Sequence, residues 1–521
     1  MTYLSAFSGC LLMLINSGLF AQPGMPDLNF GNAGQVTTAF GNGDDYGQSV
    51  AVQPDGKLVV AGFTNNGSQV VFAVARYLPD GRPDSTFSND GRQTTSFGTG
   101  DHRAYAVALQ SDGKIVVAGF ATVNNEFDFA IARYQPDGAL DPTFSGDGKT
   151  TTNLGGFFDK AYALVIQPDG KIVVAGNLGQ NTNSDFGLVR YHPNGTLDAA
   201  FGNGGIATLP IGSSYDELHA LALQSDGKIV AAGFTDNGTD YDFALARFTT
   251  AGLPDPGFNG TGKQSTPIGN MGDYGQSVVV QPDGGIVLLG YTASTTLDYD
   301  FALVRYLPDG SPDNSFGNAG TVVTAITPSF DAGYALALQP DGKIVAGGYA
   351  AGNGHPEFAV ARYLPNGNPD TGFGLNGITH TDLLTGTDQI TALAIGTDGK
   401  IVAAGRSNNG TDFDFAVARY LSGLLVDAHD LSKSENPLRL APNPVCDQAV
   451  LTYDVEDETW FSLALYDYSG RLVQTFFDNE KRDEGVHHEV LVFRKSVAAG
   501  NYLLLLNSGL GIRKVQVVKV E

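Results

Sequence analysis

The chain has 521 residues, with 55 Asp and Glu against 30 Lys and Arg, so its formal net charge is −25. An acidic chain of this kind repels a phosphate backbone, and we therefore expect no nucleic-acid partner. Two cysteines are too few for a disulfide scaffold or a zinc site with several cysteine ligands, whereas 68 glycines and a hydrophobic content of 42% predict a turn-rich chain with a substantial core.

The N-terminus carries an apolar run, LSAFSGCLLMLINSGLFA, over residues 4–21. Because the run ends in the small residue Ala21, it predicts a secretory signal peptide over residues 1–21, although MTY at the start contains no basic residue. Cys10 offers a lipoprotein alternative, but most of the apolar run follows it. No other segment has about 18 uninterrupted apolar residues, so no transmembrane segment is expected in the mature chain.

A repeat dominates the rest of the chain. The segment ALQSDGKIVVAGF at 108–120 is one of seven similar copies, and each copy is followed by a segment like FAVARY and, in six of the seven, by a short Thr-rich segment. The copies are anchored at intervals of 57 or 58 residues by Gln53, Gln110, Gln167, Gln224, Gln281, Gln339 and Gly396. Each period predicts four strands, the first two joined by a tight hairpin at Q-P-D-G.

The seventh repeat lacks its Thr-rich segment, and the missing copy stands at the other end of the chain. Residues 25–40, MPDLNFGNAGQVTTAF, match residues 311–326, SPDNSFGNAGTVVTAI. A ring uses this offset, because the N-terminal strand near Gln35–Phe40 can pair beside Phe415–Tyr420 and cover an open sheet edge. The sequence therefore predicts an all-β fold, a seven-bladed β-propeller of four-stranded blades over residues 25–421.

The pattern QPDGKIVVAG, DFALARYLPDG and D..FG..G resembles the delta-60 repeat of secreted bacterial proteins. The resemblance covers about three quarters of the chain. It implies a propeller and no defined reaction.

The repeat pattern ends at Tyr420. Residues 422–437 lack the repeat and are interpreted as a linker, and residues 438–521 alternate as a small antiparallel β-sandwich. Within that segment LRLAPNPVCDQAVLTYDV, LYDYSGRLV, AAGNYLLLL and KVQVVKV resemble the C-terminal sorting domain of the type IX secretion system of Bacteroidota. The resemblance implies the secretion machinery as a partner, and a secreted or outer-membrane surface-attached protein.

Catalytic motifs are missing from the sequence. It contains no H-E-x-x-H and no G-x-S-x-G, and Gly148-Lys149-Thr150 lacks the first glycine of a phosphate loop, so no catalytic residue is predicted. One arginine recurs in every repeat, and we expect these side chains to pair with carboxylates between blades. They are Arg76, Arg133, Arg190, Arg247, Arg305, Arg362 and Arg419. The lysines after the hairpin turns, such as Lys57 and Lys114, are expected to be solvated.

Variation between repeats is concentrated on one predicted face. The loops that enter the first strand and join the second to the third differ from blade to blade, whereas the P-D-G turns on the opposite face are nearly identical. One acidic position recurs on the variable face, eight residues before each anchor, with His102 in its place in the second repeat: Asp45, Asp159, Asp216, Asp273, Asp331 and Asp388. A ring of carboxylates at the axis would favour Ca²⁺ or another cationic group. Alternatively, each Asp caps its own turn or pairs with an arginine.

Two classes of function are consistent with the sequence. The first is a binding or adhesion module with an extracellular glycan or protein ligand. The alternative is a surface enzyme that acts on extracellular polysaccharide as a glycosidase or lyase. The propeller has no Trp, which argues against a sugar-stacking cleft, although Tyr and Phe could substitute.

Overall fold

The structure is a computed structural model. It describes residues 22–423 and 438–520, apart from 181–182, 296–297, 352–353, 385, 444, 456–458, 468–471, 496, 498–499 and 509–510. The predicted signal peptide and nearly all of the predicted linker lie outside the described residues, and both stay predictions. Within the described residues no helix is long and apolar enough to cross a membrane.

Seven four-stranded antiparallel sheets form the propeller, so the predicted all-β, seven-bladed architecture is confirmed. Blade 1 is β2 (Asp45–Val52), β3 (Leu58–Asn65), β4 (Val70–Tyr77) and β5 (Arg92–Thr95); blade 2 is β6 (His102–Leu109), β7 (Ile115–Val123), β8 (Glu126–Tyr134) and β9 (Lys149–Thr152). Blade 3 is β10 (Lys160–Ile166), β11 (Ile172–Gln180), β12 (Asn183–Tyr191) and β13 (Ile206–Leu209). Blade 4 is β14 (Asp216–Leu223), β15 (Ile229–Asp236), β16 (Tyr241–Phe248) and β17 (Lys263–Thr266).

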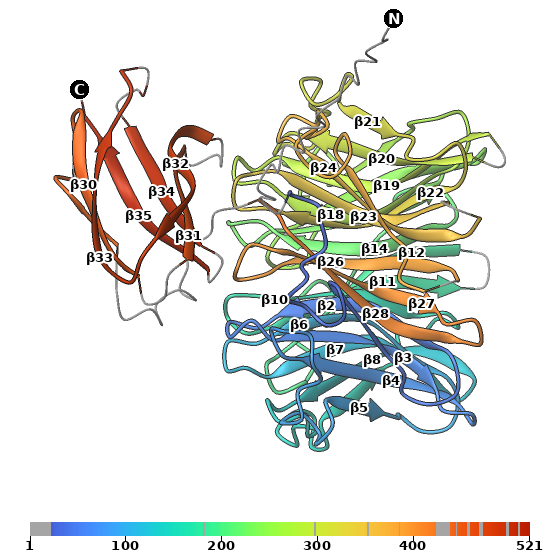
Figure 1. Cartoon of the computed structure of the whole chain (residues 1–521). Helices are drawn as coiled ribbons and strands as arrows, with labels where there is room; N and C mark the ends of the chain where they lie inside the picture. Colours follow the sequence, from blue (N-terminus) through green and yellow to red (C-terminus); the bar gives the residue numbers. More distant parts are fainter. Residues whose placement is uncertain are drawn as a thin grey trace, which may run out of the picture.

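Blade 5 is β18 (Asp273–Val280), β19 (Ile286–Thr295), β20 (Asp298–Tyr306) and β21 (Thr321–Thr324); blade 6 is β22 (Asp331–Leu338), β23 (Ile344–Ala351), β24 (Pro356–Tyr363) and β25 (Ile378–Thr381). Blade 7 is β26 (Asp388–Ile395), β27 (Ile401–Asn408) and β28 (Phe413–Tyr420), completed by β1 (Gln35–Thr38) from the N-terminus. In Figure 1 the orange strands of blade 7 accordingly lie next to the blue strands of blade 1.

The N-terminal strand closes the ring as predicted. β1 pairs antiparallel with β28, with Gln35 opposite Ala418 and Thr38 opposite Phe415. The Tyr77 hydroxyl of blade 1 then donates to Thr38 Oγ1 at 2.8 Å. The same bond from a third-strand tyrosine to the fourth strand of the preceding blade recurs between most blades. β1 therefore makes the contacts of any other fourth strand.

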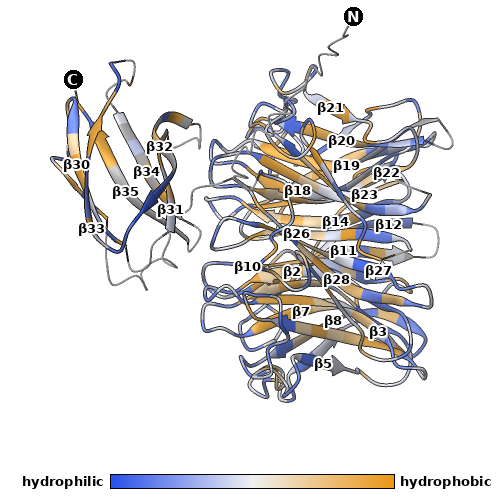
Figure 2. Ribbon diagram, viewed as in Figure 1, coloured by the Kyte–Doolittle hydropathy of each residue, from blue (hydrophilic) through white to orange (hydrophobic). Residues whose placement is uncertain are grey.

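The propeller core lies between the blades. Seven separate clusters of buried apolar side chains each combine residues of two neighbouring blades, and one of them joins blade 7 to blade 1 through Phe30, Val50 and Phe415. Figure 2 shows the apolar residues along the strands and the hydrophilic ones in the loops. This pattern follows from alternating and continuously apolar strands packed face to face.

The arginine that recurs in every repeat links neighbouring blades. Arg76 Nε donates to Asp84 Oδ2 at 2.8 Å, and its Nη1 donates to the carbonyl oxygen of Pro136 in blade 2. The expected pairing with a carboxylate is therefore confirmed, but the carboxylate belongs to the same blade and the contact between blades is to a backbone carbonyl. In blade 7 Arg419 pairs with Asp27 of the N-terminal segment at 2.6 Å and donates to Pro79 of blade 1 at 2.5 Å.

The lysines after the hairpin turns are less solvated than expected. The Lys57 side chain is only 26% exposed, and its Nζ lies 3.2 Å from Asp55 and 3.4 Å from Asp84. The same second contact recurs for Lys114, Lys171, Lys228, Lys343 and Lys400. The Asp that holds the arginine therefore holds the lysine as well.

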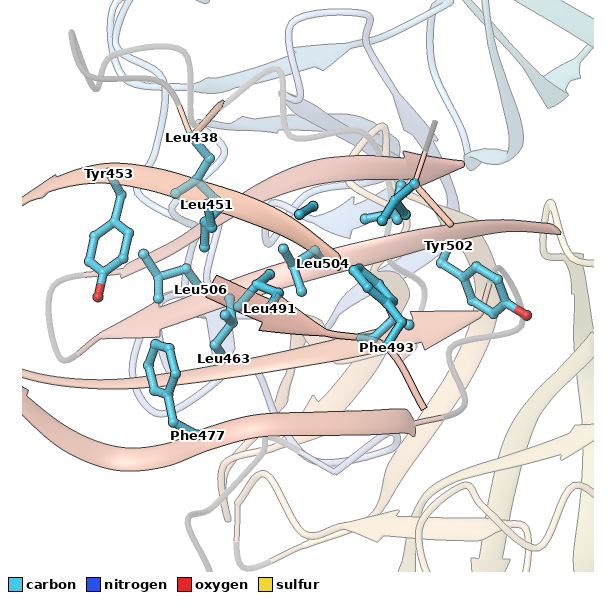
Figure 3. Close-up of a cluster of buried hydrophobic side chains, with 14 of the residues drawn as sticks. Leu438, Leu451, Tyr453, Leu463, Phe477, Leu491, Phe493, Tyr502, Leu504 and Leu506 are labelled. Atoms are coloured by element: carbon cyan, nitrogen blue, oxygen red, sulfur yellow. The ribbon is translucent and has the colours of Figure 1, made fainter. Parts of the chain in front are cut away.

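Residues 438–520 form two further sheets with a core of their own. One sheet contains β29 (Arg439–Ala441), β30 (Gln448–Val455) and β33 (Gly485–Val492). The other has the order β32 (Leu472–Arg482), β31 (Thr459–Asp467), β34 (Gly500–Ser508) and β35 (Gly511–Lys519). Leu451, Leu463, Leu491 and Leu504 pack between them (Figure 3). This is the arrangement of a small β-sandwich.

Candidate ligand-binding face of the propeller

Every innermost strand carries a β-bulge at the same repeat position. In blade 1, Gly47 pairs with Gly62 and Ser49 with Ala61, so Gln48 between them has no partner in the ladder. The other blades repeat this shift. A bulge re-aims the side chain of the extra residue. The seven bulge residues are Gln48, Tyr105, Tyr162, His219, Gln276, Tyr334 and Thr391.

A repeat glycine makes room for each bulge. A Cβ on Gly62 would overlap the carbonyl oxygen of Tyr46 just before the bulge, and the equivalent glycine of every other blade meets the equivalent carbonyl. Only glycine tolerates such a close backbone approach inside a strand. The glycine that ends the segments V-A-G, A-A-G, L-L-G and A-G-G is thus the sequence signal for the bulge, and it was not among the signals used above.

The bulge residues converge on the propeller axis. A cavity of about 250 Å³, which we call the axial hollow, is lined by all of them together with Gln389 and Arg406. Two further hollows share residues with it. One of about 460 Å³ shares Gln48, Tyr105 and Arg406, and one of about 290 Å³ shares Tyr162. The three neighbouring hollows lie on the predicted variable face, and we call them together the axial mouth. Its volume is in the range of small-ligand sites.

Aromatic rings surround the axial mouth. Tyr105 makes an edge contact with Tyr162, with ring centroids 5.0 Å apart, and Tyr162 lies 5.1 Å from the His219 ring. On the other side of the axis, Tyr291 lies 5.8 Å from Tyr334. Burial raises the pKa of Tyr105, Tyr162 and Tyr334, so all three phenols are neutral near pH 7. They therefore present ring faces and hydroxyl groups, and no charge.

Three cations lie among these rings. Arg406 Cζ lies 4.7 Å from the centroid of Tyr46, Lys160 Nζ lies 4.9 Å from that of Phe127, and Arg103 Cζ lies 5.1 Å from that of Phe63. Burial lowers the pKa of Arg406 and of Lys160, although neighbouring acidic and phenolic groups oppose the shift. Cation–π contact offsets part of the cost of holding a charge in this position.

Two carboxylates flank the mouth. Glu217 accepts a hydrogen bond from the Tyr215 hydroxyl at 2.8 Å and lies 3.5 Å from His219 Nε2. Asp44 accepts from the backbone N–H of Phe413 at 3.1 Å. Burial lowers the pKa of His219, so this imidazole is neutral at pH 7. The mouth thus contains cations, aromatic rings, amides and a few acceptors.

The recurrent Asp position lies beneath the mouth. All six side chains are fully buried, and each accepts a hydrogen bond from the backbone N–H five residues earlier in the loop that enters its own blade: Phe40, Leu154, Ile211, Ile268, Ile326 and Leu383. His102 is also fully buried, and its Nε2 lies 3.2 Å from the Gly98 carbonyl oxygen.

This geometry favours the turn-capping alternative over a carboxylate ring. None of Asp45, Asp159, Asp216, Asp273, Asp331 and Asp388 lines the three hollows. In the part of the chain that the structure describes, no group of three or more His, Cys, Asp or Glu side chains is placed to hold a metal ion. Binding of Ca²⁺ stays a prediction, to be tested by calcium titration of the wild type against the Asp216→Asn and Asp273→Asn variants.

The opposite face carries a hollow of a different character. A cavity of about 400 Å³ there is lined by Gln167, Pro168, Asp169, Lys171 and Arg190, among others. Except for the position of Pro168, nearly every repeat fills these positions with the same residue, and Lys171 and Arg190 both pair with Asp198. Their charges are therefore already satisfied within the framework.

Comparison with known proteins agrees with the fold. A family model described as "Domain of unknown function (DUF5122) beta-propeller" matches residues 53–87, 110–144, 167–201, 224–258, 281–316, 339–373 and 396–428. No curated protein matches the chain in sequence.

Similar solved structures have low identity. The structure of the polysaccharide lyase Uly1 is 12% identical, with 75% of this chain and 91% of that chain covered and a TM-score of 0.42. Sqt1 from Chaetomium thermophilum, bound to the N-terminus of ribosomal protein L10, is 11% identical over 74% of this chain and 98% of that one, with a TM-score of 0.40. Drosophila Plexin A in complex with Semaphorin 1b is 10% identical over 77% and 88%, with a TM-score of 0.39.

These likenesses concern the propeller fold and carry no argument about what this chain binds. Each of the seven family matches covers the second and third strands of one blade. The propeller of this chain is therefore built from repeats of the DUF5122 β-propeller family.

Proposed function

We propose that the protein is an extracellular binding module whose propeller takes its ligand at the axial mouth. The observation that carries the proposal is the loss of repeat symmetry there. At the bulge position the seven blades carry Gln, Tyr, Tyr, His, Gln, Tyr and Thr, whereas the arginine of the framework is the same in all seven. Residues that differ between otherwise equal repeats, on one face, are typical of a binding surface.

The composition of the mouth suits recognition of a polar ligand with flat apolar faces. Amide groups such as Gln48 and Gln276 can both donate and accept, as can the tyrosine hydroxyls, while the rings offer stacking surfaces. An extracellular glycan or a protein loop has both properties. The Tyr and Phe residues of the mouth thus provide stacking surfaces in the absence of Trp from the propeller.

A binding array is the direct test of this proposal. The full-length mature chain should bind at least one class of extracellular glycan or protein, and a Tyr105→Ala/Tyr334→Ala variant should lose that binding. Leu253→Ala is the matched control, because Leu253 is 56% exposed in a loop of the opposite face. Thermal unfolding of each variant checks that the fold survives. If binding survives in the tyrosine variant and is lost in the Leu253 variant, the site lies on the face opposite the axial mouth.

A second candidate is an enzyme that acts on extracellular polysaccharide. The pair of neutral His219 and Glu217 favours it, since an imidazole beside a carboxylate can accept a proton from a bound substrate. The test is a screen for soluble products released from extracellular polysaccharides. Release by the wild type and not by His219→Ala would establish catalysis, and binding without release would leave the binding module.

We further propose that residues 438–521 direct export through a type IX secretion system and that the protein acts at the cell surface. The support is the motif resemblance of this segment together with its separate sandwich core. Truncation after Gly423 should leave a folded propeller that accumulates in the periplasm. Normal delivery of the truncated protein to the surface would contradict the proposal.

A further inference from the structure

Most of the cations of the propeller occupy recurrent positions of the repeat. Thirteen of them occupy the two repeat positions, one arginine per blade and six lysines, and these pair with framework aspartates. Arg103, Lys160 and Arg406 belong to neither position. In the other blades, the place of Arg406 is taken by Phe, Asn or Tyr, and that of Lys160 by Tyr, Arg, Glu, Ala or Gln. All three line the axial mouth.

These three cations are weakly neutralised. Among the residues that the structure describes, no ion pair is formed by Lys160 or Arg406, and the only one of Arg103 is a contact of 3.6 Å with Asp101. Arg406 Nη2 donates to Gln389 Oε1 at 2.6 Å, while its Nε is buried without a hydrogen-bond partner. Burying a charge without a counter-ion costs free energy, so such groups are expected where a ligand supplies the anion.

The cations are combined with accessible rings. Next to Lys160 the loop into blade 3 carries Phe157 and Phe158, which are 52% and 47% exposed, and Phe158 lines the same hollow as Lys160. No other blade has two consecutive aromatic residues in this loop. An exposed ring beside an unpaired cation can contact the flat face of a ligand while the cation contacts its negative group.

We propose that the axial mouth binds a glycan bearing carboxylate or sulfate groups. This inference rests on the proposed function and names the ligand class for the same site. Arg103, Lys160 and Arg406 would pair with the anionic groups, and Phe158 and Tyr105 would contact the sugar rings. The amides and hydroxyls between them favour a glycan over an acidic peptide, because each sugar hydroxyl both donates and accepts. The site thereby attracts an anion to a chain whose net charge is −25.

Titration of the full-length mature chain with polygalacturonate, dextran sulfate and the neutral polymer dextran tests the inference. We expect binding of at least one charged polymer, weakened by salt, and a loss of at least about tenfold in affinity for Lys160→Gln/Arg406→Gln. The matched control is Arg82→Gln, which removes one charge from an exposed pair with Asp80 on the opposite face. Phe158→Ala removes a ring that is 47% exposed, so it tests the contact with the sugar at little cost to folding, and it should also weaken binding.

The outcomes separate the inference from the proposed function. Equal affinity of wild type and Lys160→Gln/Arg406→Gln, or binding of dextran alone, would overturn the inference and leave a binding module. Poly-glutamate binding as tightly as polygalacturonate would overturn the assignment to a glycan. The two charged polymers distinguish carboxylate from sulfate recognition. If the chain binds no glycan and no protein on the array, the proposed function itself is overturned.

Discussion

At the scale of single residues, one aspartate per blade organises the framework. The pKa of Asp84 falls to about 2, because hydrogen bonds from Thr86 and the charges of Arg76 and Lys57 outweigh the effect of its burial. In blade 7 this place is taken by Asp27, whose pKa is likewise lowered by Lys400 and Arg419 against the effect of burial. Asp27 comes from the far end of the chain, so a repeat position is completed by a residue about 390 positions away.

Asp27→Asn should therefore destabilise the ring. The substitution leaves the buried Arg419 guanidinium without its carboxylate, and breaking a buried pair from one side costs about 3 kcal/mol. Asp80→Asn is the control, because its partner Arg82 is 74% exposed and such surface pairs contribute about 0–1 kcal/mol. Chemical denaturation of both variants measures the difference. Equal stability of the two would show that the closing pair is unimportant.

The buried aspartates beneath the mouth should make stability depend on pH. Burial raises the pKa of Asp45 and of Asp388 to about 6, against the effect of their hydrogen bonds. Since the folded state binds these protons more tightly than the unfolded state, the two groups destabilise the fold above pH 6 and cease to do so as the pH falls below it. The effect is on the order of 2–3 kcal/mol for each group.

A double variant isolates this contribution from the buried histidines, which act in the opposite direction because burial lowers the pKa of His102 and His219. The gain in unfolding free energy of Asp45→Asn/Asp388→Asn over the wild type should be larger at pH 8 than at pH 5. Unfolding free energies at the two pH values provide the comparison. A gain over the wild type that is equal at the two pH values, or larger at pH 5, would contradict the assigned pKa shifts.

At the scale of strands and turns, the repeat predicted most of the fold. The blade number, the four strands per blade and the pairing of the N-terminal strand follow from the spacing of the copies and from the displaced Thr-rich segment. The bulges were not predicted, because the innermost strands have only seven or eight residues, too few to reveal the shift in alternation that one extra residue causes. It also assigned Asp45 and its equivalents to the axis as one possibility, although the bulge turns the later position, such as Gln48, toward it.

Charge was the feature hardest to read from the sequence. The recurrent aspartates suggested Ca²⁺ or another cationic group as a ligand, yet each of them accepts a hydrogen bond from the loop that enters its own blade. Arg103 and Lys160 share one repeat position and Arg406 occupies another, and neither position carries a cation in the remaining blades, so no recurrent pattern marks the three. Only the folded ring brings the three to one depression.

Deletion of residues 25–41 should open the ring. The deletion exposes the edge of β28 and removes Phe30, the Asp27–Arg419 pair and the bond from Tyr77 to Thr38. We expect a strong fall in the thermal unfolding temperature and a tendency to aggregate through the free edge. A synthetic peptide of residues 25–41, added in trans, should restore part of the stability. An unchanged unfolding temperature after deletion would show that β1 is not needed for closure.

At the scale of the whole molecule, the propeller is a symmetric framework with one asymmetric depression. The arginine and aspartate of each repeat, with the lysine that six repeats carry, hold the opposite face together, and the P-D-G turns there are nearly identical. The bulges leave one position per blade free to vary at the axis. This division explains how seven similar repeats can carry a site that none of them contains alone.

Hydroxyl-radical footprinting of the full-length mature chain with polygalacturonate shows whether ligand binds at the axial mouth. The polymer should reduce oxidation of Phe158, Tyr105 and Tyr334, while Leu253 on the opposite face stays as reactive as in the free protein. Protection of Leu253 with no change at the three aromatic residues would contradict binding at the axial mouth.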